Sequence, residues 1–593
     1  MDLSLVSVSP SLASPSVLRR AVPSVTNFAE RSPAVAFAIL SAAYLLVVGV
    51  LSHNKVLWLD ELITLHIAQL GSPVAIWNAL AHAADPNPPL THLAVLASLR
   101  IFGEHEFALR LPAILGYWAG LLALFLFLRR RLPAIWALAG VVFSMSNAAF
   151  DYSYESRSYG IFYGLAMLSV LFWSRAVDPE STVMRRRLAL CGMTLSLAAG
   201  ICTNYFAVLA LFPIAGGELV RTLGFSRARS PRIFETRVWF ALTLAATPLL
   251  AFRGLIQHSI DQFAPHAWNK VSFDQVSDSY TGMVEVIFFP AVFLLAFAAL
   301  VWLLGRLCSY CRANLRPRWL GELADHHARG SGVPLPPHEA AATLVLTLYP
   351  FLGYLIASIH GGMLSPRFVI PVCLGFAIAG VMAAYQVFGH LRQAGAIALA
   401  ICSVVFLGRV CTVGQIYHQQ KECFNQVLHR LAEIPGHQPI VVADPLMVLT
   451  LAHYAPRSVA SRIVFPVDFP AIRRFRGEDS PEENLWAGRN LYHLSILPLA
   501  DFQHNAGDYL ILASDGNWLV RDLWDHSYPV HRLPIFFPSK VIGGFTPLDH
   551  GDPVFFLGAG DRSGQTRLCP GPVPFRIAAN LPGSPAMKLN RGL

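Results

Sequence analysis

The chain has 593 residues, of which 54% are hydrophobic and only 14% are charged. A soluble protein of this length carries about a quarter charged residues, so the composition excludes a soluble globular protein and indicates a membrane protein. The formal net charge of +9 does not indicate nucleic-acid binding, because in membrane proteins basic loops mark the cytoplasmic side of the membrane. We expect a lipid bilayer and no nucleic acid as partners.

Three parts follow one another along the chain. Residues 1–33 are rich in Ser and Pro and are expected to form a disordered cytoplasmic tail before an uncleaved first span. Residues 34–411 carry long apolar runs and are expected to form a polytopic α-helical membrane module. Residues 412–593 have the composition of an ordinary soluble domain.

Apolar segments within the membrane module give about eleven candidate transmembrane helices, since each is near the length that crosses a hydrocarbon layer of about 30 Å. A further apolar segment, 88–103, contains His92, Arg100 and two leading prolines, which favour a juxtamembrane helix in the first external loop. The candidate spans are 34–52, 107–128, 133–150, 159–174, 188–202, 205–220, 238–253, 283–305, 341–359, 368–388 and 394–411.

The arginine clusters fix the expected orientation. With the N-terminus inside and segment 88–103 left out of the count, every dense cluster falls in a cytoplasmic loop, as the positive-inside rule requires. An odd number of spans then places residues 412–593 outside the cell. The cytoplasmic loops in this arrangement are 129–131, 174–187, 221–237, 306–321 and 389–392.

The C-terminal part has the alternation expected of a small α/β domain. Strand-like runs occur in "PIVVADP" (439–445), "GDYLILASDG" (507–516) and "DPVFFLGAG" (552–560). The apolar stretch "LMVLTLAHYA" (446–455) is a plausible helix between the first two. We therefore expect an extracytoplasmic α/β domain at 412–593.

A set of ionisable residues falls on the external side at membrane depth, where burial costs several kcal/mol unless the groups are paired or hydrated. The first interpretation is therefore a shared polar cavity. The alternative is that each residue caps a helix or meets lipid headgroups. The set comprises Asp60, Glu61, Asp85, Glu155, Arg157, His258, Lys270, His360 and Arg367.

Two motifs of the first external loop carry acidic residues. In "LWLDELITLH" (57–66), Asp60 falls at the N-cap or first turn of a predicted helix, and Asp60 with Glu61 forms the candidate catalytic pair. Neighbouring residues point in different directions on a helix, so Asp60 is expected to face the cavity as general base and Glu61 to serve packing, orientation or tuning. "DPNPPLTHL" (85–93) is a rigid elbow that carries Asp85 and Asn87.

Four motifs in this order resemble a known family. They are the Asp-Glu pair, the later Pro-Pro-Leu elbow, "YESRSYG" with Glu155, Arg157 and Tyr159, and "SPRF" with Arg367 before a late span. The pattern resembles the GT-C membrane glycosyltransferases, in the group of the protein O-mannosyltransferases and the lipid A aminoarabinose transferase. The likeness covers residues 34–411.

The resemblance implies an enzyme of the bacterial inner membrane whose donor is a sugar on a polyprenyl phosphate. It implies that Asp60 is the base, that Glu155 and Arg157 form the acid-arginine cluster, and that Arg367 meets the donor phosphate. Many relatives have His directly before Pro-Pro-Leu, where this chain has Asn87. Asn does not titrate, which argues against a proton relay at that position.

Sugar transfer needs a base for the acceptor hydroxyl and cations for the departing phosphate. Asp60 can supply the first, and Arg367, Arg157 and more weakly Lys270 the second. Glu155 and Asp85 can each either hold Arg157 or bind sugar hydroxyls. Direct displacement at the anomeric carbon inverts its configuration, and the residues demand no metal or other cofactor.

Other external residues are candidates for substrate contacts. His258 and Lys270 lie in a predicted long loop, 253–275, that either closes as a lid or stays solvated. Asn204 and Tyr205 lie at a break between two spans and can contribute to a donor groove. The acceptor can be a lipid, a glycan or a protein. The alternative function is a lipid-linked-sugar transporter or flippase, which would place charges near mid-membrane.

Overall fold

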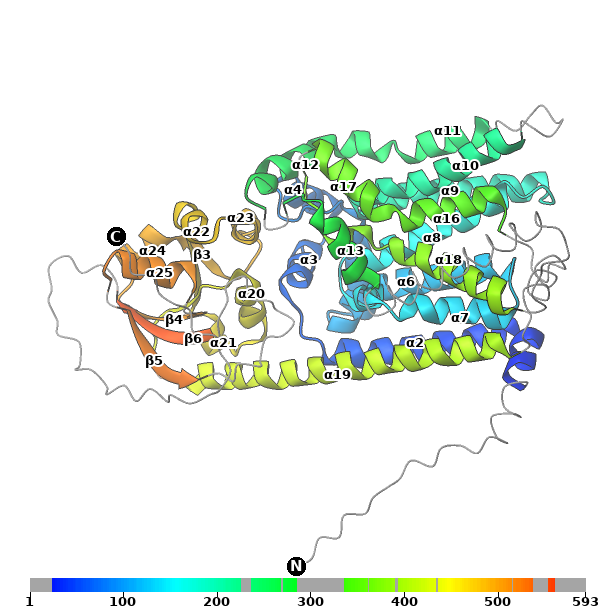
Figure 1. Cartoon of the computed structure of the whole chain (residues 1–593). Helices are drawn as coiled ribbons and strands as arrows, with labels where there is room; N and C mark the ends of the chain where they lie inside the picture. The colour runs from blue at the N-terminus through cyan, green and yellow to red at the C-terminus, as the bar shows by residue number, and fades with distance from the viewer. Residues whose placement is uncertain are drawn as a thin grey trace, which may run out of the picture.

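The computed structural model describes residues 24–225, 236–267, 270–284, 335–360, 362–389, 393–433, 436–514, 516–528, 530–536 and 553–559. A helical bundle and an α/β domain lie end to end, and helix α19 (Ala394–Glu433) runs from one into the other (Figure 1). Most of the predicted tail, nearly all of the predicted span 283–305 and the chain after residue 559 lie outside the described residues.

Five helices in the described part of the chain are long and apolar enough to cross a membrane, or up to seven if each of two bent helix pairs counts as one span. The single spans are α2 (Pro33–Asn54), α6 (Glu106–Arg129), η2 with α10 (Tyr205–Leu223), α11 with α12 and η3 (Thr236–His266) and α19. The bent pairs are α7 (Ala134–Met145) with η1 (Ala148–Tyr154), and α16 (Pro337–Thr347) with α17 (Tyr349–His360).

Three further predicted segments form helices that fall short of this standard. They are α8 (Tyr159–Ala176), α9 (Val183–Thr203) and α18 (Val372–Phe388). Helix α18 has 17 residues, fewer than the roughly 20 that a typical span needs. Helix α9 carries three consecutive arginines, Arg185 to Arg187, near its N-terminus, and they lower its hydropathy.

Helices α6 and α8 pack with their backbones in close approach. A Cβ atom on Gly164 would lie 2.0 Å from the carbonyl oxygen of Gly116, and one on Gly160 would lie 2.5 Å from that of Ala113. Small residues at helix crossings allow such packing in membrane proteins. Because α8 begins two residues after Arg157, this packing fixes the position of the turn that carries Arg157.

The first loop, residues 55–105 between α2 and α6, folds into three short helices at one end of the bundle (Figure 1). They are α3 (Leu59–Gln69), α4 (Pro73–Ala81) and α5 (Leu90–Phe102). Helix α5 has 13 residues, too few to cross a bilayer, as expected for segment 88–103. It starts directly after Pro89, which can stand at a helix N-terminus because it lacks an N–H group.

The predicted loop 253–275 is mostly helical, so that prediction is wrong. Helix α12 (Pro248–Phe263) continues through its first half, η3 (Ala264–His266) follows, and α13 (Asp274–Val284) begins at its end. Phe252, Leu255 and Phe263 are buried, whereas the polar residues between them are more exposed. A helix with one apolar face satisfies its own backbone hydrogen bonds, which an extended lid would have to leave to water.

The C-terminal part contains a six-stranded sheet of order β3-β2-β1-β4-β6-β5. The pairs β1–β2, β1–β4 and β2–β3 are parallel, and β6 runs antiparallel to β4 and β5. The strands are β1 (Ile440–Val442), β2 (Ile463–Val467), β3 (Ser495–Pro498), β4 (Asp508–Ser514), β5 (Val530–Phe536) and β6 (Pro553–Ala559), so three of them lie in the predicted runs. The helices are α20 (Pro445–Tyr454), α21 (Arg457–Ala460), α22 (Phe469–Arg476), α23 (Ser480–Ala487), α24 (Leu499–Asn505) and α25 (Trp518–Asp525).

No helix break occurs at the predicted boundary 411/412. Helix α19 has 40 residues and is therefore about 60 Å long at 1.5 Å per residue. It carries the chain out of the bundle and past the first loop before β1 begins. The first loop and the C-terminal domain also share one apolar core, in which Leu62 and Ile67 of α3 lie with Val448 and Leu451 of α20.

Candidate functional site

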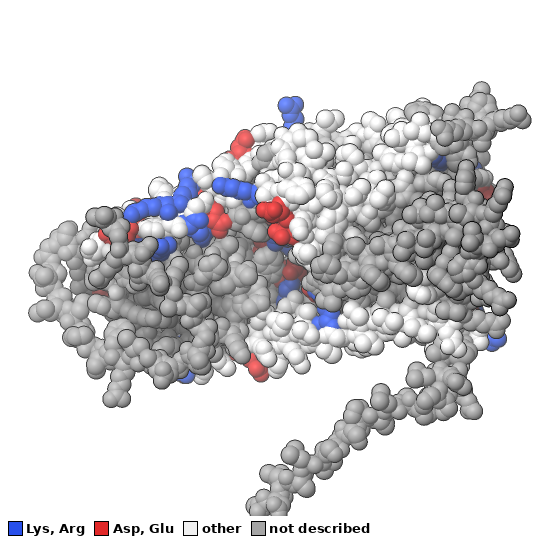
Figure 2. Space-filling model, in the orientation of Figure 1, with Lys and Arg blue, Asp and Glu red and all other residues white. Residues whose placement is uncertain are grey.

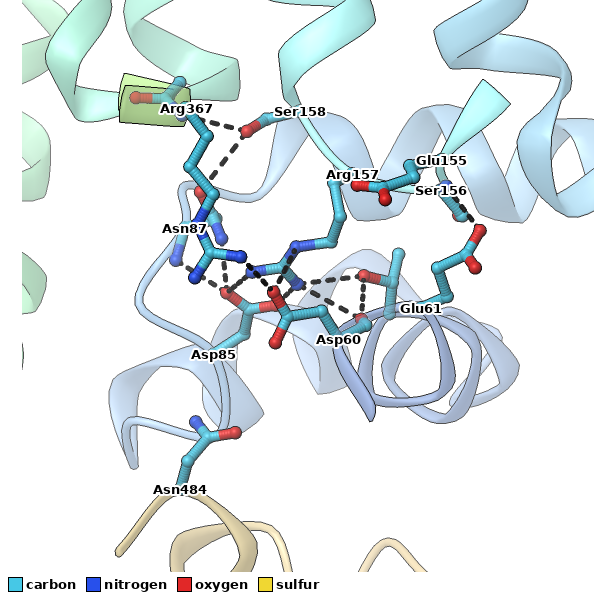
Figure 3. Close-up of polar contacts among 12 residues, drawn as sticks. Asp60, Glu61, Asp85, Asn87, Glu155, Ser156, Arg157, Ser158, Arg367 and Asn484 are labelled. Carbon is cyan, nitrogen blue, oxygen red and sulfur yellow. Dashed lines mark hydrogen bonds and ion pairs between the residues drawn. The ribbon is translucent and has the colours of Figure 1, made fainter. Parts of the chain in front are cut away.

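Charged side chains gather in a hollow between the bundle and the C-terminal domain. Figure 2 shows acidic and basic residues together inside this hollow, whereas the described surface of the bundle beside it is mainly uncharged. The first loop lies at the end of the bundle that faces the C-terminal domain (Figure 1). The sequence-predicted residues Asp60, Asp85, Arg157 and Arg367 converge in this region (Figure 3).

Asp60 lies in the first turn of α3 and points toward two arginines (Figure 3). Its Oδ2 atom is 3.2 Å from Nη1 of Arg367 and 3.7 Å from Nε of Arg157. Its side chain keeps 17% of its surface exposed. A carboxylate in this position is stabilised by the helix N-terminus and by both guanidinium groups, yet a small molecule can still reach it.

Arg157 is buried and is held by the elbow of the first loop. It forms an ion pair with Asp85, and its Nη1 atom also donates to Oγ1 of Thr64 at 3.1 Å. Asn87 donates to Oδ1 of Asp85 from its backbone at 2.9 Å and from its side chain at 2.6 Å. Burial alone would raise the pKa of Asp85, but Arg157 and His92 bring it well below its ordinary value. Asp85 therefore stays charged and orients Arg157 toward Asp60.

Arg367 belongs to η6 (Pro366–Val369) and comes from the other side of the hollow. The rings of Trp58, Tyr159 and Phe368 surround its guanidinium, with centroids 5.8 to 5.9 Å from Cζ. Its side chain is 20% exposed. Aromatic faces stabilise a cation, and a guanidinium can bind phosphate oxygens through its N–H groups. Tyr159, a sequence-predicted site residue, is thus one wall of this aromatic box.

Glu61 points away from the hollow, although it is adjacent to Asp60. Its two oxygens accept from Nε and Nη2 of Arg110, both at 2.8 Å, and Oε1 also accepts from the backbone N–H of Ser156 at 2.9 Å. Burial raises the pKa of Glu61, but Arg110 brings it below its ordinary value. The structure therefore favours orientation of α3 over direct catalysis as the role of Glu61.

Replacing Glu61 by Gln should destabilise the protein by about 3 to 5 kcal/mol, because Arg110 would keep its charge in a buried site without a carboxylate. Glu104→Gln is the matched control, since Glu104 is an exposed residue of the same loop. Denaturant unfolding in detergent measures both variants. Equal stability of the two would show that the Glu61–Arg110 pair does not hold α3.

Glu155 binds a residue that the sequence analysis did not single out. Its Oε1 atom is 2.5 Å from Nζ of Lys55, which also lies over the rings of Tyr154 and Tyr417. Burial raises the pKa of Glu155, and Lys55 opposes that shift. The Arg157 side chain is held by Asp85 instead. Of the two predicted partners of Arg157, the structure selects Asp85.

Asn204 is the residue before η2, and Tyr205 is the first residue of η2. Asn204 donates to Oγ of Ser158 at 2.9 Å and accepts from the backbone N–H of Phe206 at 2.9 Å. Tyr205 packs edge-on against Phe252, with ring centroids 6.0 Å apart. Within the described residues, Asn204 thus supports Ser158, which in turn donates to Asn87 at 3.4 Å.

Two predicted substrate-binding residues are not joined to the cluster. His258 is exposed on α12, and Lys270 is exposed beside an isolated backbone bridge to Met363. Among the described residues, no hydrogen bond or ion pair connects either side chain to Asp60, Arg157 or Arg367. The helical conformation of α12 accounts for this, because it keeps residue 258 on the outer side of the bundle.

His66 of α3 lies against the C-terminal domain, with its ring 5.3 Å from that of Tyr492. Burial, together with the nearby His453 and His493, lowers the pKa of His66 to about 4. The unfolded chain therefore binds more protons between pH 6.5 and about 4, so stability should fall as the pH falls through this range. His66→Phe should reduce that loss, measured as the drop in thermal unfolding midpoint between about pH 7 and about pH 5. The exposed His504→Phe variant should lose as much stability as the unchanged protein, and an equal loss in His66→Phe would contradict the assignment.

Comparisons with known proteins give one family match and two structural matches. Residues 86–252 match the model of the dolichyl-phosphate-mannose-protein mannosyltransferase family. A comparison with curated proteins found no match. The crystal structure of ArnT from Cupriavidus metallidurans in the apo state has 11% identity and a TM-score of 0.42, covering 89% of this chain and 98% of that chain. The structure of the same protein bound to undecaprenyl phosphate has 10% identity and a TM-score of 0.36, covering 88% and 98%.

At these identities and scores, the structural likeness does not by itself establish a function. The family match begins directly after Asp85 and covers the rest of the elbow with Asn87, the turn that holds Glu155 and Arg157, and the helices between them. The match over residues 86–252 confirms the resemblance of this chain to the group of membrane glycosyltransferases that contains the protein O-mannosyltransferases.

Proposed function

We propose that this protein is an integral-membrane glycosyltransferase that moves a sugar from a polyprenyl-phosphate donor to an extracytoplasmic acceptor. The observation that carries the proposal is the position of Asp60, 3.2 Å from Arg367 and 3.7 Å from Arg157. A partly exposed carboxylate between two cations provides a base and a phosphate site within one small region. The family match and the apolar helices beside the hollow agree with a lipid-linked donor.

In the proposed reaction, Asp60 accepts the proton of the acceptor hydroxyl as the oxygen attacks the anomeric carbon. The bond between that carbon and the phosphate oxygen breaks, and the lipid phosphate leaves with the electron pair. Arg367, with Arg157 beside it, stabilises the negative charge on the departing phosphate. Displacement from the opposite face inverts the anomeric configuration.

The arrangement also assigns supporting roles. Asp85 and Asn87 hold Arg157, Glu61 holds α3 through Arg110, and the aromatic box keeps Arg367 at the mouth of the hollow. A phosphate that approaches Arg367 would compete with Asp60 for the same guanidinium. Donor binding would then release Asp60 from Arg367 and leave its carboxylate to meet the acceptor hydroxyl.

Purified protein in proteoliposomes with a radiolabelled polyprenyl-phosphate sugar tests the proposal. The expected result is label on an acceptor from a cell-envelope extract, with release of the polyprenyl phosphate. Movement of the intact lipid-linked sugar across the bilayer without cleavage would support the flippase alternative instead. Neither transfer nor cleavage in the presence of several sugar donors would contradict the proposed function.

A further inference from the structure

Leu57 lies three residues before Asp60, and a helix of the C-terminal domain binds both of its backbone polar groups. The Tyr454 hydroxyl accepts from the Leu57 N–H at 3.1 Å, and the Thr450 hydroxyl donates to the Leu57 carbonyl at 3.1 Å. The Tyr454 hydroxyl donates in turn to Oε1 of Glu106 at 2.5 Å, at the first residue of α6. One side chain of α20 thus links the segment before α3 to the start of a bundle helix.

These hydrogen bonds lie at the edge of a buried contact. Leu57, Leu59 and Leu62 belong to the same apolar core as Val448 and Leu451 of α20. Thr450 itself is only 1% exposed. Hydrogen bonds in such a setting have well-defined geometry, because a broken bond would leave a buried polar group without a partner.

A second contact holds the other motif of the first loop. The side-chain amide of Asn484, in α23, donates to the carbonyl of Ala84 at 3.1 Å, directly before Asp85. The C-terminal domain therefore holds the backbone next to Asp60 and the backbone next to Asp85. On the opposite side, Glu61 and Arg110 attach α3 to the bundle. Helix α3, which carries Asp60, is therefore attached to the C-terminal domain on one side and to the bundle on the other.

We infer that the C-terminal domain is a positioning element of the active site, and that Thr450 and Tyr454 are its positioning residues. They hold Leu57 and the extended N-cap residue Trp58, so that α3 starts at Leu59 and directs Asp60 toward Arg367. The effect on catalysis rests on the proposed function, whereas the hold on residues 57–60 does not. The domain is thereby assigned a part in the transfer step and not only a binding role at the surface.

Two substitutions in the full-length protein test the inference. Tyr454→Phe removes the hydroxyl that binds the Leu57 N–H and Glu106, and Thr450→Val removes only the hydrogen bond to the Leu57 carbonyl. Tyr509→Phe is the matched control, because Tyr509 is a buried tyrosine of the same domain that lies in the apolar core on the other face of the sheet. Hydrogen–deuterium exchange of a peptide covering residues 56–62 and steady-state transfer kinetics are the two measurements.

Each test variant should exchange in residues 56–62 about two- to ten-fold faster than the unchanged protein, the factor expected for one lost hydrogen bond. Each should also lower kcat by about ten-fold or more with little change in KM for the donor, because Asp60 is displaced while the phosphate site remains. Tyr509→Phe should change neither quantity. Rates of exchange equal to those of Tyr509→Phe would overturn the inference, as would faster exchange with an unchanged kcat.

The same experiment separates this inference from the proposed function. If the unchanged protein transfers no sugar, the proposed function and the assignment of Thr450 and Tyr454 to catalysis both fail. The exchange rates of residues 56–62 then still decide whether the C-terminal domain holds the segment. If the unchanged protein transfers sugar and the two variants match it in kcat, only the positioning role fails.

Discussion

Replacing Asp60 by Asn is expected to lower kcat for sugar transfer by about 100- to 10,000-fold, the usual contribution of a general base. Asn keeps the size of the side chain and can still meet Arg157 and Arg367, but it cannot accept the proton of the acceptor hydroxyl. Donor binding should persist, because the arginines that face the phosphate are unchanged. Transfer from a labelled polyprenyl-phosphate sugar and equilibrium binding of the donor measure the two effects.

Asp151→Asn is the matched control for this substitution. Asp151 is also a partly exposed carboxylate paired with an arginine, Arg409, but it lies on η1 outside the Asp60 cluster. It should transfer sugar at close to the normal rate. A kcat for Asp60→Asn within about ten-fold of the unchanged protein would exclude Asp60 as the base. Loss of donor binding in Asp60→Asn would instead indicate that the carboxylate organises the phosphate site.

The convergence of Asp60, Arg157 and Arg367 could be predicted from the sequence. Ionisable residues at membrane depth need partners, and the positive-inside rule placed these three on one face of the bundle. The distances between them then follow from the fold, with the elbow at Asp85 orienting one arginine and η6 presenting the other. The motifs and the side of the membrane on which they lie were sufficient to predict this convergence, because the energetic cost of an unpaired charge is large.

It was harder to predict from the sequence which residues form each ion pair. Arg110 lies in the first turns of an apolar helix, 49 residues after Glu61, and its neighbours in the sequence do not indicate which residue it pairs with. Lys55 is a lone charge at the end of the first span, and only the fold brings it to Glu155. A lone arginine directly after the start of a predicted span is the signal that could have suggested a buried partner.

The contacts of the C-terminal domain with the first loop could not be predicted from sequence spacing. The two hydrogen bonds to Leu57 join residues 393 and 397 positions apart. The run "LMVLTLAHYA" is visibly apolar, but its pattern does not say which surface it covers. The error at 253–275 has a different cause, since a helix with polar residues on its outer side resembles a solvated loop in composition.

Replacing Arg367 by Ala is expected to lower kcat by about 100- to 1,000-fold, the usual effect of removing one group that stabilises charge in the transition state. It should also weaken donor binding, because the guanidinium in the box of Trp58, Tyr159 and Phe368 is the more exposed of the two cations in the cluster. Arg367→Lys keeps the charge but loses the planar fork that binds two phosphate oxygens, so it should retain part of the activity. Donor binding and transfer kinetics of both variants, with thermal unfolding as a check on folding, are the measurements.

Comparison of Arg367→Ala alone and combined with Asp60→Asn separates a role of Arg367 in phosphate binding from a purely structural role. If Arg367 serves only to balance the charge of Asp60, then Arg367→Ala combined with Asp60→Asn should be no less stable than Asp60→Asn alone, and Arg367→Ala should leave donor affinity unchanged. If Arg367 holds the leaving phosphate, donor affinity falls in Arg367→Ala whether residue 60 is Asp or Asn. A donor dissociation constant that is the same in Arg367→Ala and the unchanged protein would therefore remove Arg367 from the phosphate site, and with it the reason for placing the lipid headgroup beside Asp60.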